Sequence, residues 1–151
     1  MKNNFRCDCP ITSALDVLGD KWILVIVKQM LLEKKQTFKD FTESDESVAT
    51  NILTTKLNLL VELKIVTKSK LPGNKKSVYY HLTERGLSLA TIVVELAIWS
   101  DENLRDFNSI MGNGKELTMM KTNKIEFINM IKDDYIKNIQ SSWPLRSPTC
   151  P

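Results

Sequence analysis

Residues 49–63 form a segment of helix length whose hydrophobic and polar positions fall on opposite sides. Leu53, Leu57 and Leu60 recur at intervals of four and three residues, which predicts a helix that packs this side into a core. The other side carries mostly short hydrogen-bonding side chains, where an ordinary solvated helix carries mainly Glu and Lys. Thr and Asn are poor helix formers, so their clustering indicates a second constraint. The polar side and its edges consist of Thr50, Asn51, Thr54, Thr55, Lys56, Asn58 and Glu62.

Amides and hydroxyls of this kind hydrogen-bond base edges and phosphate oxygens in the major groove of DNA. The helix alone is equally compatible with a DNA-reading surface and with an ordinary polar surface. The next segment helps to distinguish them. Residues 65–71 and 78–82 are rich in β-branched and aromatic residues, and they flank a loop, 72–77, that contains Pro72 and Gly73. This pattern predicts a β-hairpin.

Positive charge is concentrated in and around this hairpin. Residues 49–80 contain six lysines and one glutamate, an excess of five positive charges, whereas the whole 151-residue chain has a net charge of +3. A basic hairpin directly after a polar-faced helix is the order of a winged helix-turn-helix, in which the helix enters the major groove and the wing contacts phosphates. The alternative is an edge hairpin whose lysines only protect it from aggregation.

Further helices are predicted on the N-terminal side of this unit. Residues 10–18 should form a helix that begins at Pro10 and is closed by Gly19. Asp20 should cap a second helix over residues 21–33. A short helix containing Phe38 and Phe41 would be the first helix of the helix-turn-helix.

On the C-terminal side, Thr83 should cap one long helix over residues 84–104 that is apolar on more than one side. Such a helix needs cover from more than one neighbour, and a second subunit is a natural source. Residues 112–115 are expected to form a loop, residues 124–139 a final helix, and residues 141–151 an irregular tail. The residues expected at the dimer interface are Ile92, Val93, Leu96 and Trp99.

These elements predict a mainly α fold with a small β-hairpin wing, a winged helix-turn-helix that is dimeric through its terminal helices. We expect residues 1–104 to form the DNA-binding and dimerisation domain and residues 105–151 a helical extension with a tail. The content of 42% hydrophobic and 26% charged residues is typical of a soluble globular protein. No apolar run reaches the roughly 18 residues that span a bilayer. The N-terminus lacks the apolar stretch of a secretory signal, so a cytoplasmic protein without membrane contact is expected.

The sequence offers no positive support for catalysis. His81 is the only histidine and falls in the second strand of the hairpin, where a simple strand residue is expected. No Cys/His set has zinc-site spacing, no glycine-rich phosphate loop is present, and no Ser/His/Asp set can be assembled. We therefore expect no enzymatic activity, no metal and no cofactor.

Cys7 and Cys9 precede the first helix, and Cys150 lies near the C-terminus. Cys9 stands before Pro10 at a helix N-terminus, where the helix dipole lowers a thiol pKa, and Arg6 would act in the same direction. Cys9 is therefore a candidate redox residue, with Cys7 as its neighbour. An inert packed thiol or an incidental metal contact would explain the C-x-C pattern equally well.

Several motifs follow one another along residues 9–99. They are C-P-I-T-S-A-L-D-V-L-G-D-K-W-I-L at residues 9–24, T-F-K-D-F at 37–41, the three leucines described above, I-V-x-K at 65–68 and V-Y-Y-H-L-T-E-R-G at 78–86. In this order they resemble the HxlR family of MarR-like winged helix-turn-helix transcriptional regulators. The resemblance implies a homodimer joined through the first helix and the long helix after the wing, and a partly palindromic operator. It also implies regulation by small molecules or oxidants, with Cys9 at the redox-sensing position of some members.

Three positions depart from the family pattern. Ala49 stands where Ser or Thr usually begins the recognition helix, so capping must come from elsewhere, with Ser47 as one candidate. Lys64 replaces the glycine before the first wing strand and tolerates a left-handed conformation less well. Ser77 stands where a basic residue often precedes the second wing strand, and Lys76 lies one position earlier.

Together these features predict a sequence-specific transcriptional regulator, most simply a repressor, that binds double-stranded operator DNA as a homodimer and responds to a small-molecule or oxidant effector. One alternative is a redox-sensing regulator of the same fold with Cys9 as its switch. The other is a winged helix used for protein contact. The residues expected at DNA are Thr50, Asn51, Thr54, Thr55, Lys56, Asn58, Lys75 and Lys76.

Overall fold

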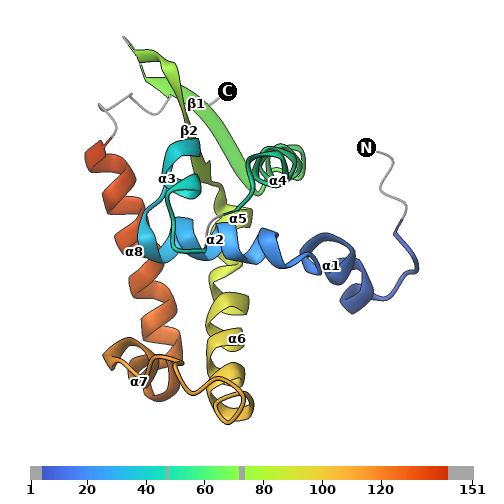
Figure 1. Ribbon diagram of the computed structural model, residues 1–151, viewed down its shortest axis with the longest axis vertical. Coiled ribbons are helices and arrows are strands. Elements are labelled where there is room, and N and C mark those ends of the chain that lie inside the picture. The colour runs from blue at the N-terminus through green and yellow to red at the C-terminus, as the bar shows by residue number, and fades with distance from the viewer. Residues whose placement is uncertain (1–4, 47, 72–73, 143–151) are drawn as a thin grey trace. The chain divides into compact units, whose positions relative to one another are not determined.

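The computed structural model describes residues 5–46, 48–71 and 74–142, and it contains two compact units, Met1–Leu89 and Ala90–Pro151, which we treat separately. Helices dominate both units, and the sheet formed by the described residues has two antiparallel strands. The predicted mainly α fold with a hairpin wing is thereby confirmed. The first unit contains, in chain order, α1 (Pro10–Leu18), α2 (Lys21–Glu33), α3 (Phe38–Thr42), α4 (Thr50–Glu62), β1 (Val66–Leu71), β2 (Asn74–Leu82) and α5 (Glu84–Ser88) (Figure 1).

The first two helices begin and end where the sequence predicts. Pro10 occupies the start of α1, where its missing N–H has no consequence. Asp20 Oδ1 accepts a hydrogen bond from the Trp22 N–H at 2.9 Å and caps α2. α2 then contacts α1, α4 and β2, which makes it the central element of the unit. Its buried residues are Ile23, Ile26, Val27, Gln29, Met30 and Leu31.

The leucine stripe of α4 is buried, as its spacing predicts. Leu53, Leu57 and Leu60 have almost no exposed surface, and α4 packs against α2 and β1. Burial of a leucine side chain stabilises a fold by about 1.5–3 kcal/mol, so the stripe fixes how the helix is turned. The polar side of α4 is consequently directed to solvent.

The end of α4 has a tight hydrogen-bonded turn at Lys64. The Ile65 N–H donates to Leu60 O at 2.9 Å and the Lys64 N–H donates to Val61 O at 3.0 Å, the pair of bonds that ends many helices. Lys64 itself has a φ of 56°, in the left-handed region that favours glycine. The chain therefore adopts the turn that the family's glycine would supply, but with a lysine.

The hairpin wing is confirmed, but its second strand is longer than predicted. β2 begins at Asn74, so residues 74–77, which were expected in the loop, belong to the strand. Leu71 pairs with Asn74 across an irregular register, and Pro72 and Gly73 of the expected loop lie outside the described residues. Polar residues have weak strand propensity, but hydrogen bonding to a neighbouring strand can outweigh it.

The prediction of a single long helix over residues 84–104 is wrong. Thr83 does cap the first turn, since its Oγ1 accepts a hydrogen bond from the Gly86 N–H at 3.2 Å. The helix then ends at Ser88, because the Leu89 N–H bonds to Gly86 O three residues back and tightens the turn. Gly86 lies so close to Ile65 that a Cβ would come within 2.3 Å of the Ile65 oxygen. The apolar pattern continues through the break, so periodicity alone could not reveal it.

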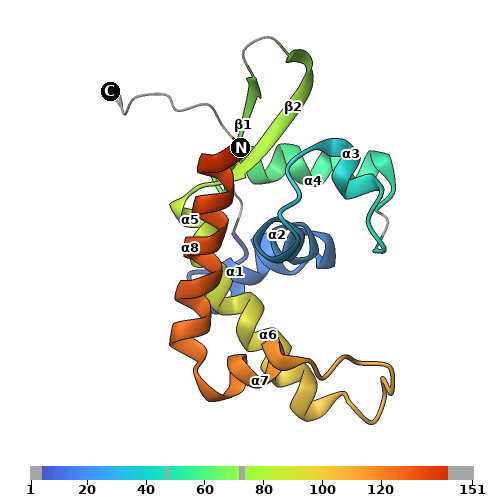
Figure 2. The same ribbon diagram turned by 90° about the vertical axis from the view of Figure 1, so that its left-hand side faces the viewer.

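The second unit contains α6 (Ala90–Asn103), α7 (Lys115–Thr122) and α8 (Lys124–Ser142). α7 lies across the end where α6 stops and α8 begins, and it contacts both helices (Figure 1 and Figure 2). Lys115, expected in a loop, begins α7, a helix that the sequence did not predict. Lys121 Nζ lies 2.8 Å from Asp101 Oδ2, an ion pair that connects α7 to α6.

The predicted apolar stripe of α8 is present. Ile128, Ile131 and Tyr135 are buried, and Ile139 is half-buried. Lys124 Nζ lies 2.5 Å from Glu95 Oε1 and connects the start of α8 to α6. Residues 143–151, which contain most of the predicted irregular tail and Cys150, lie outside the described residues.

Candidate DNA-binding surface

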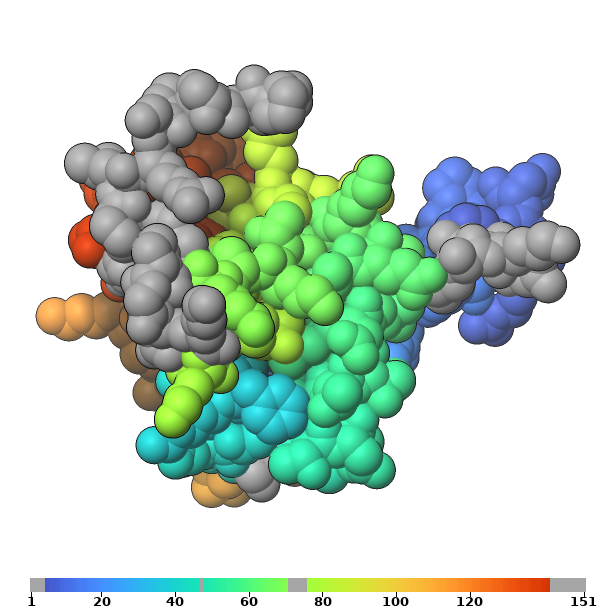
Figure 3. Space-filling view, turned by 90° about the horizontal axis from the view of Figure 1, so that it is seen from above, coloured from blue at the N-terminus to red at the C-terminus, as the bar shows by residue number. Residues whose placement is uncertain are grey.

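The exposed side of α4 consists of the polar residues singled out by the sequence pattern. Thr50, Asn51, Thr54, Thr55 and Asn58 are all exposed. α4 and the hairpin lie next to each other on one face of the first unit, as the contact between α4 and β1 requires (Figure 3). The polar helix face and the wing therefore form one continuous candidate surface.

The N-terminus of α4 is capped from within the helix. Ala49 is the N-cap residue and offers no side-chain hydrogen bond. Asn51 Oδ1 accepts a hydrogen bond from the Ile52 N–H at 2.9 Å and so satisfies one of the free donors of the first turn. Ser47, the cap candidate from the sequence, lies outside the described residues.

Two threonines in the middle of this face have their hydroxyl protons turned to the backbone. Thr54 Oγ1 donates to Thr50 O at 2.8 Å, and Thr55 Oγ1 donates to Asn51 O at 2.9 Å. A hydroxyl has one proton and two lone pairs, so each oxygen keeps acceptor capacity toward solvent. Both side chains also present a γ-methyl group.

Lys56 is held at the edge of this face by a carboxylate of another element. Its Nζ lies 2.8 Å from Asp20 Oδ2, and its side chain is 20% exposed. The hydrogen bond from Lys56 is the main reason that the pKa of Asp20 lies below its ordinary value. Asp20 thus caps α2 and also pairs with Lys56 of α4. The sequence does not reveal this second role, because Asp20 and Lys56 are distant along the chain.

The wing supplies the positive charge of the surface. Lys68, Lys70 and Lys76 are exposed on β1 and β2. Lys75 belongs to β2, but its side chain lies outside the described part of the structure. The lysines of β1 and of the start of β2 therefore lie on the same candidate surface as the polar face of α4.

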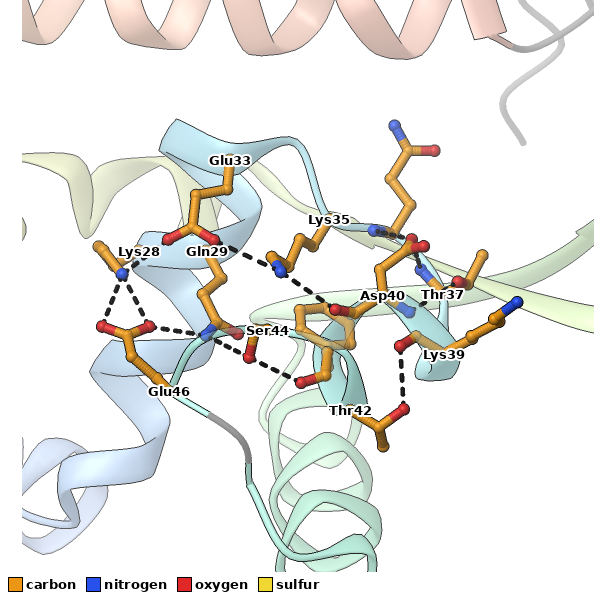
Figure 4. A network of polar contacts seen from close by, with 12 residues as sticks. Lys28, Gln29, Glu33, Lys35, Thr37, Lys39, Asp40, Thr42, Ser44 and Glu46 are labelled. Carbon is orange, nitrogen blue, oxygen red and sulfur yellow. Dashed lines mark hydrogen bonds and ion pairs between the residues drawn. The ribbon is translucent and has the colours of Figure 1, made fainter.

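A polar network fixes the segment that leads into α4 (Figure 4). Gln29 of α2 is fully buried, and its Nε2 donates to Ser44 Oγ at 3.0 Å and to Glu46 Oε2 at 2.7 Å. Lys28 Nζ donates to both Glu46 oxygens at 2.8 Å and to Glu33 Oε1 at 2.7 Å. Partial burial acts to raise the pKa of Glu46, but hydrogen bonds from Lys28 and Gln29 outweigh it and hold that pKa below its ordinary value.

His81 lies in β2, as expected, and its side chain is half-buried. Desolvation lowers the pKa of this histidine. Among the described residues no group of His, Cys, Asp and Glu is arranged to hold a metal ion. Within the same residues, no helix is both long and apolar enough to cross a membrane.

Cys9 is the N-cap residue of α1 and carries a free thiol, as does the exposed Cys7. Hydrogen bonds from the Thr12 backbone, the Thr12 side chain and the Ile11 backbone lower the pKa of Cys9. Arg6, which was expected to act on Cys9, pairs instead with Asp16, since its Nε lies 2.5 Å from Asp16 Oδ1.

Three of the four residues expected at a dimer interface are exposed. Ile92, Leu96 and Trp99 form an apolar stripe along α6 that solvent reaches, whereas Val93 is buried. In the first unit, α1 has no buried residue, and its apolar side chains Ile11 and Leu15 are 73% and 57% exposed. Both surfaces are unusual for a monomer, because apolar side chains grouped on one face normally find cover.

A family model, the HxlR-like helix-turn-helix, matches residues 17–107, which include α2, α3, α4 and both strands of the wing. The chain belongs to this HxlR-like family. It is 32% identical to the HTH-type transcriptional regulator YodB of Bacillus subtilis (strain 168) over 95 residues, which are 62% of this chain and 84% of YodB. Family membership and the winged helix-turn-helix make the protein a DNA-binding transcriptional regulator.

Two solved structures have a fold similar to that of this chain. The chain is similar to PA1607, described as a putative transcription factor, with a TM-score of 0.61 and 28% identity over 72% of this chain and 73% of that one. It is also similar to the reduced form of the redox regulator HypR, with a TM-score of 0.58 and 29% identity over 67% of this chain and 99% of HypR. The family match ends at residue 107, so α7 and α8 lie beyond it.

Proposed function

We propose that the protein is a homodimeric repressor that inserts α4 into the major groove of an operator and rests its wing on the adjoining phosphates. The observation that carries this proposal is the exposed face of α4, where five uncharged hydrogen-bonding side chains lie beside a lysine-rich hairpin. Side chains of the first kind read base edges, and lysines bind phosphates without regard to sequence. Repression is the simplest outcome, since a bound dimer can block a promoter. The protein would then act in the cytoplasm, where its operator DNA lies.

The dimer is supported by apolar surface that a single chain leaves exposed. α1 has nine residues and none of them is buried, and helices of this length are marginal in water unless another surface covers them. The stripe of Ile92, Leu96 and Trp99 on α6 is a second uncovered apolar surface. Two-fold assembly would cover the same surfaces on both subunits.

The test is a titration of the full chain against DNA from upstream of its own gene and of neighbouring genes, followed by fluorescence anisotropy. Asn51→Ala should weaken cognate binding by about 1–3 kcal/mol and relax preference at one base pair, because a base-reading amide is lost. If Asn51→Ala weakens cognate and random DNA equally, Asn51 does not read bases. Absence of binding to any of these duplexes would instead favour a winged helix used for protein contact.

The wing is tested by salt dependence. Replacing Lys75 and Lys76 with Ala should weaken binding to all sequences and flatten the plot of log affinity against log salt by up to about two units. The matched control replaces Lys115 and Lys137, which carry the same charge on α7 and α8. If the slope changes equally in both double variants, the wing does not contact DNA.

A second candidate function is oxidant sensing at Cys9. Its position at the start of α1 and the hydrogen bonds that lower its pKa favour the reactive thiolate. One similar structure is of a protein named as a redox regulator, HypR, in its reduced form. In this alternative an oxidant such as a peroxide takes two electrons and two protons from two thiols as a disulfide forms, and the bond changes the spacing of the two reading helices.

A further inference from the structure

The exposed face of α4 is chemically suited to one class of base pair. We propose that α4 selects operator half-sites whose contacted base pairs are A·T, with Thr54 and Thr55 reading thymine methyl groups and adenine amino groups. This inference rests on the proposed function, in which α4 is the helix that enters the major groove. It adds the base composition that the helix recognises.

α4 has no unpaired cationic side chain available for guanine. Guanine presents two acceptors, O6 and N7, in the major groove, and its usual partner is a bidentate Arg or Lys. α4 contains no arginine, and Lys56 is its one lysine. Lys56 is mostly covered and its Nζ is paired with Asp20 at 2.8 Å. A guanine under this face would therefore meet no unpaired cationic side chain from the helix.

The hydroxyl groups of two threonines on this face are turned toward the helix backbone. Thr54 and Thr55 donate their protons to carbonyl oxygens one turn earlier, Thr50 O and Asn51 O. While these bonds are kept, each Oγ1 acts toward DNA as an acceptor, and each side chain adds a methyl group. An acceptor matches the N6 amino group of adenine and opposes both acceptors of guanine, and a methyl group matches the 5-methyl of thymine.

The Asn51 carboxamide keeps groups that are free to bind adenine. Its Oδ1 accepts one hydrogen bond from the Ile52 N–H, and a carbonyl oxygen has two lone pairs. The second lone pair and the two Nδ2 protons match the N6 and N7 atoms of adenine, the usual bidentate partner of Asn. The short Oδ1 to Ile52 contact also holds the amide near the helix N-terminus, where recognition helices contact bases.

These three features together favour A·T over G·C. A threonine oxygen could accept from the N4 amino group of cytosine, but the paired guanine would still present two acceptors to a face without a cation. An A·T pair offers an amino group, a matching N7 and a methyl group at once. The face satisfies all three of these groups with residues that are exposed in the free protein.

The experiment begins with selection of bound duplexes from a random pool, using the full chain. The selected half-site is then compared with two versions, one with thymine replaced by uracil and one with A·T replaced by G·C at the selected positions. Uracil pairs as thymine does but lacks the methyl group in the major groove. Loss of one methyl contact should weaken binding about fourfold, from about 0.8 kcal/mol per buried carbon.

A variant pair isolates the threonines. The double variant Thr54→Ser and Thr55→Ser keeps both hydroxyls and removes both methyl groups, so it should bind the thymine and uracil duplexes equally. The matched control is Thr122→Ser on α7, because Thr122 makes the same hydrogen bond to a carbonyl one turn earlier, Thr118 O at 3.0 Å. The control should keep the wild-type preference for thymine.

The outcomes separate this inference from the function on which it rests. A selected half-site rich in G·C, or equal wild-type affinity for thymine and uracil duplexes, overturns the A·T assignment while DNA binding stands. A double serine variant that still prefers thymine shows that these threonines do not read the methyl groups. A pool from which no duplex is recovered refutes the proposed function itself, and the inference with it.

Discussion

Glu46→Ala should destabilise the fold by about 2 kcal/mol, although Glu46 is a surface residue. The substitution removes one of the two acceptors of Gln29 Nε2, which donates to Glu46 Oε2 at 2.7 Å and to Ser44 Oγ at 3.0 Å. Gln29 is fully buried, and a buried donor without its acceptor costs about 1–3 kcal/mol. The lost ion pair with Lys28 adds about 0.2–1 kcal/mol, because both side chains are partly exposed.

Two further variants separate these contributions. Glu46→Gln keeps an oxygen that can accept from Gln29 and loses only the charge, so it should cost less than about 1 kcal/mol. Glu43→Ala is the matched control, because Glu43 pairs with Lys39 at 3.7 Å and both side chains are largely exposed. Its expected cost is below about 0.5 kcal/mol.

The assay is urea unfolding of the full chain followed by circular dichroism, with the slope against denaturant compared between variants before midpoints are converted to free energies. The expected order of stability is wild type and Glu43→Ala, then Glu46→Gln, then Glu46→Ala. If Glu46→Ala is no less stable than Glu43→Ala, the buried amide of Gln29 does not depend on Glu46 as an acceptor.

The remaining predictions concern assembly, redox response, backbone strain and pH. Leu96→Glu should sediment as a folded monomer, since an unpaired charge in the dimer interface costs several kcal/mol. The control Ile110→Glu should stay dimeric. If Leu96→Glu is still a dimer, Leu96 does not lie in the interface. Peroxide or diamide should weaken operator binding by wild type and not by Cys9→Ser, and an equal response of the two would exclude Cys9 as the sensor. Lys64→Gly should raise thermal stability by about 1 kcal/mol, because it relieves a left-handed lysine; an unchanged or lower stability refutes that strain. The pKa of Glu46 is lowered in the fold, so the contribution of its charge to stability is complete above the ordinary carboxyl pKa and is lost as pH falls through the folded value. The difference in unfolding free energy between wild type and Glu46→Gln should therefore disappear in acid. A difference that stays constant with pH would show that the charge is not responsible.

Local patterns in the sequence determined much of this fold. The leucines at positions 53, 57 and 60 set the buried side of α4, and the same spacing left Asn51, Thr54 and Thr55 on its exposed side. Asp20 and Thr83 marked helix starts because a short polar side chain satisfies the free N–H groups of a first turn. Periodicity and capping act between residues a few positions apart, so a single sequence reveals them directly.

Only the tertiary structure decided which distant side chains meet. The position of Lys56 in α4 predicts contact with DNA. In the structure Lys56 pairs with Asp20, because the packing of α4 on α2 brings this N-cap residue beside it. Glu46 and Gln29 meet for the same reason, and α5 and α6 separate at Leu89 where Gly86 lies against Ile65. A sequence shows which groups can hydrogen-bond or pair, but the choice of partner depends on packing between elements. The sequence alone therefore left open that Lys56 of α4 forms an ion pair with Asp20.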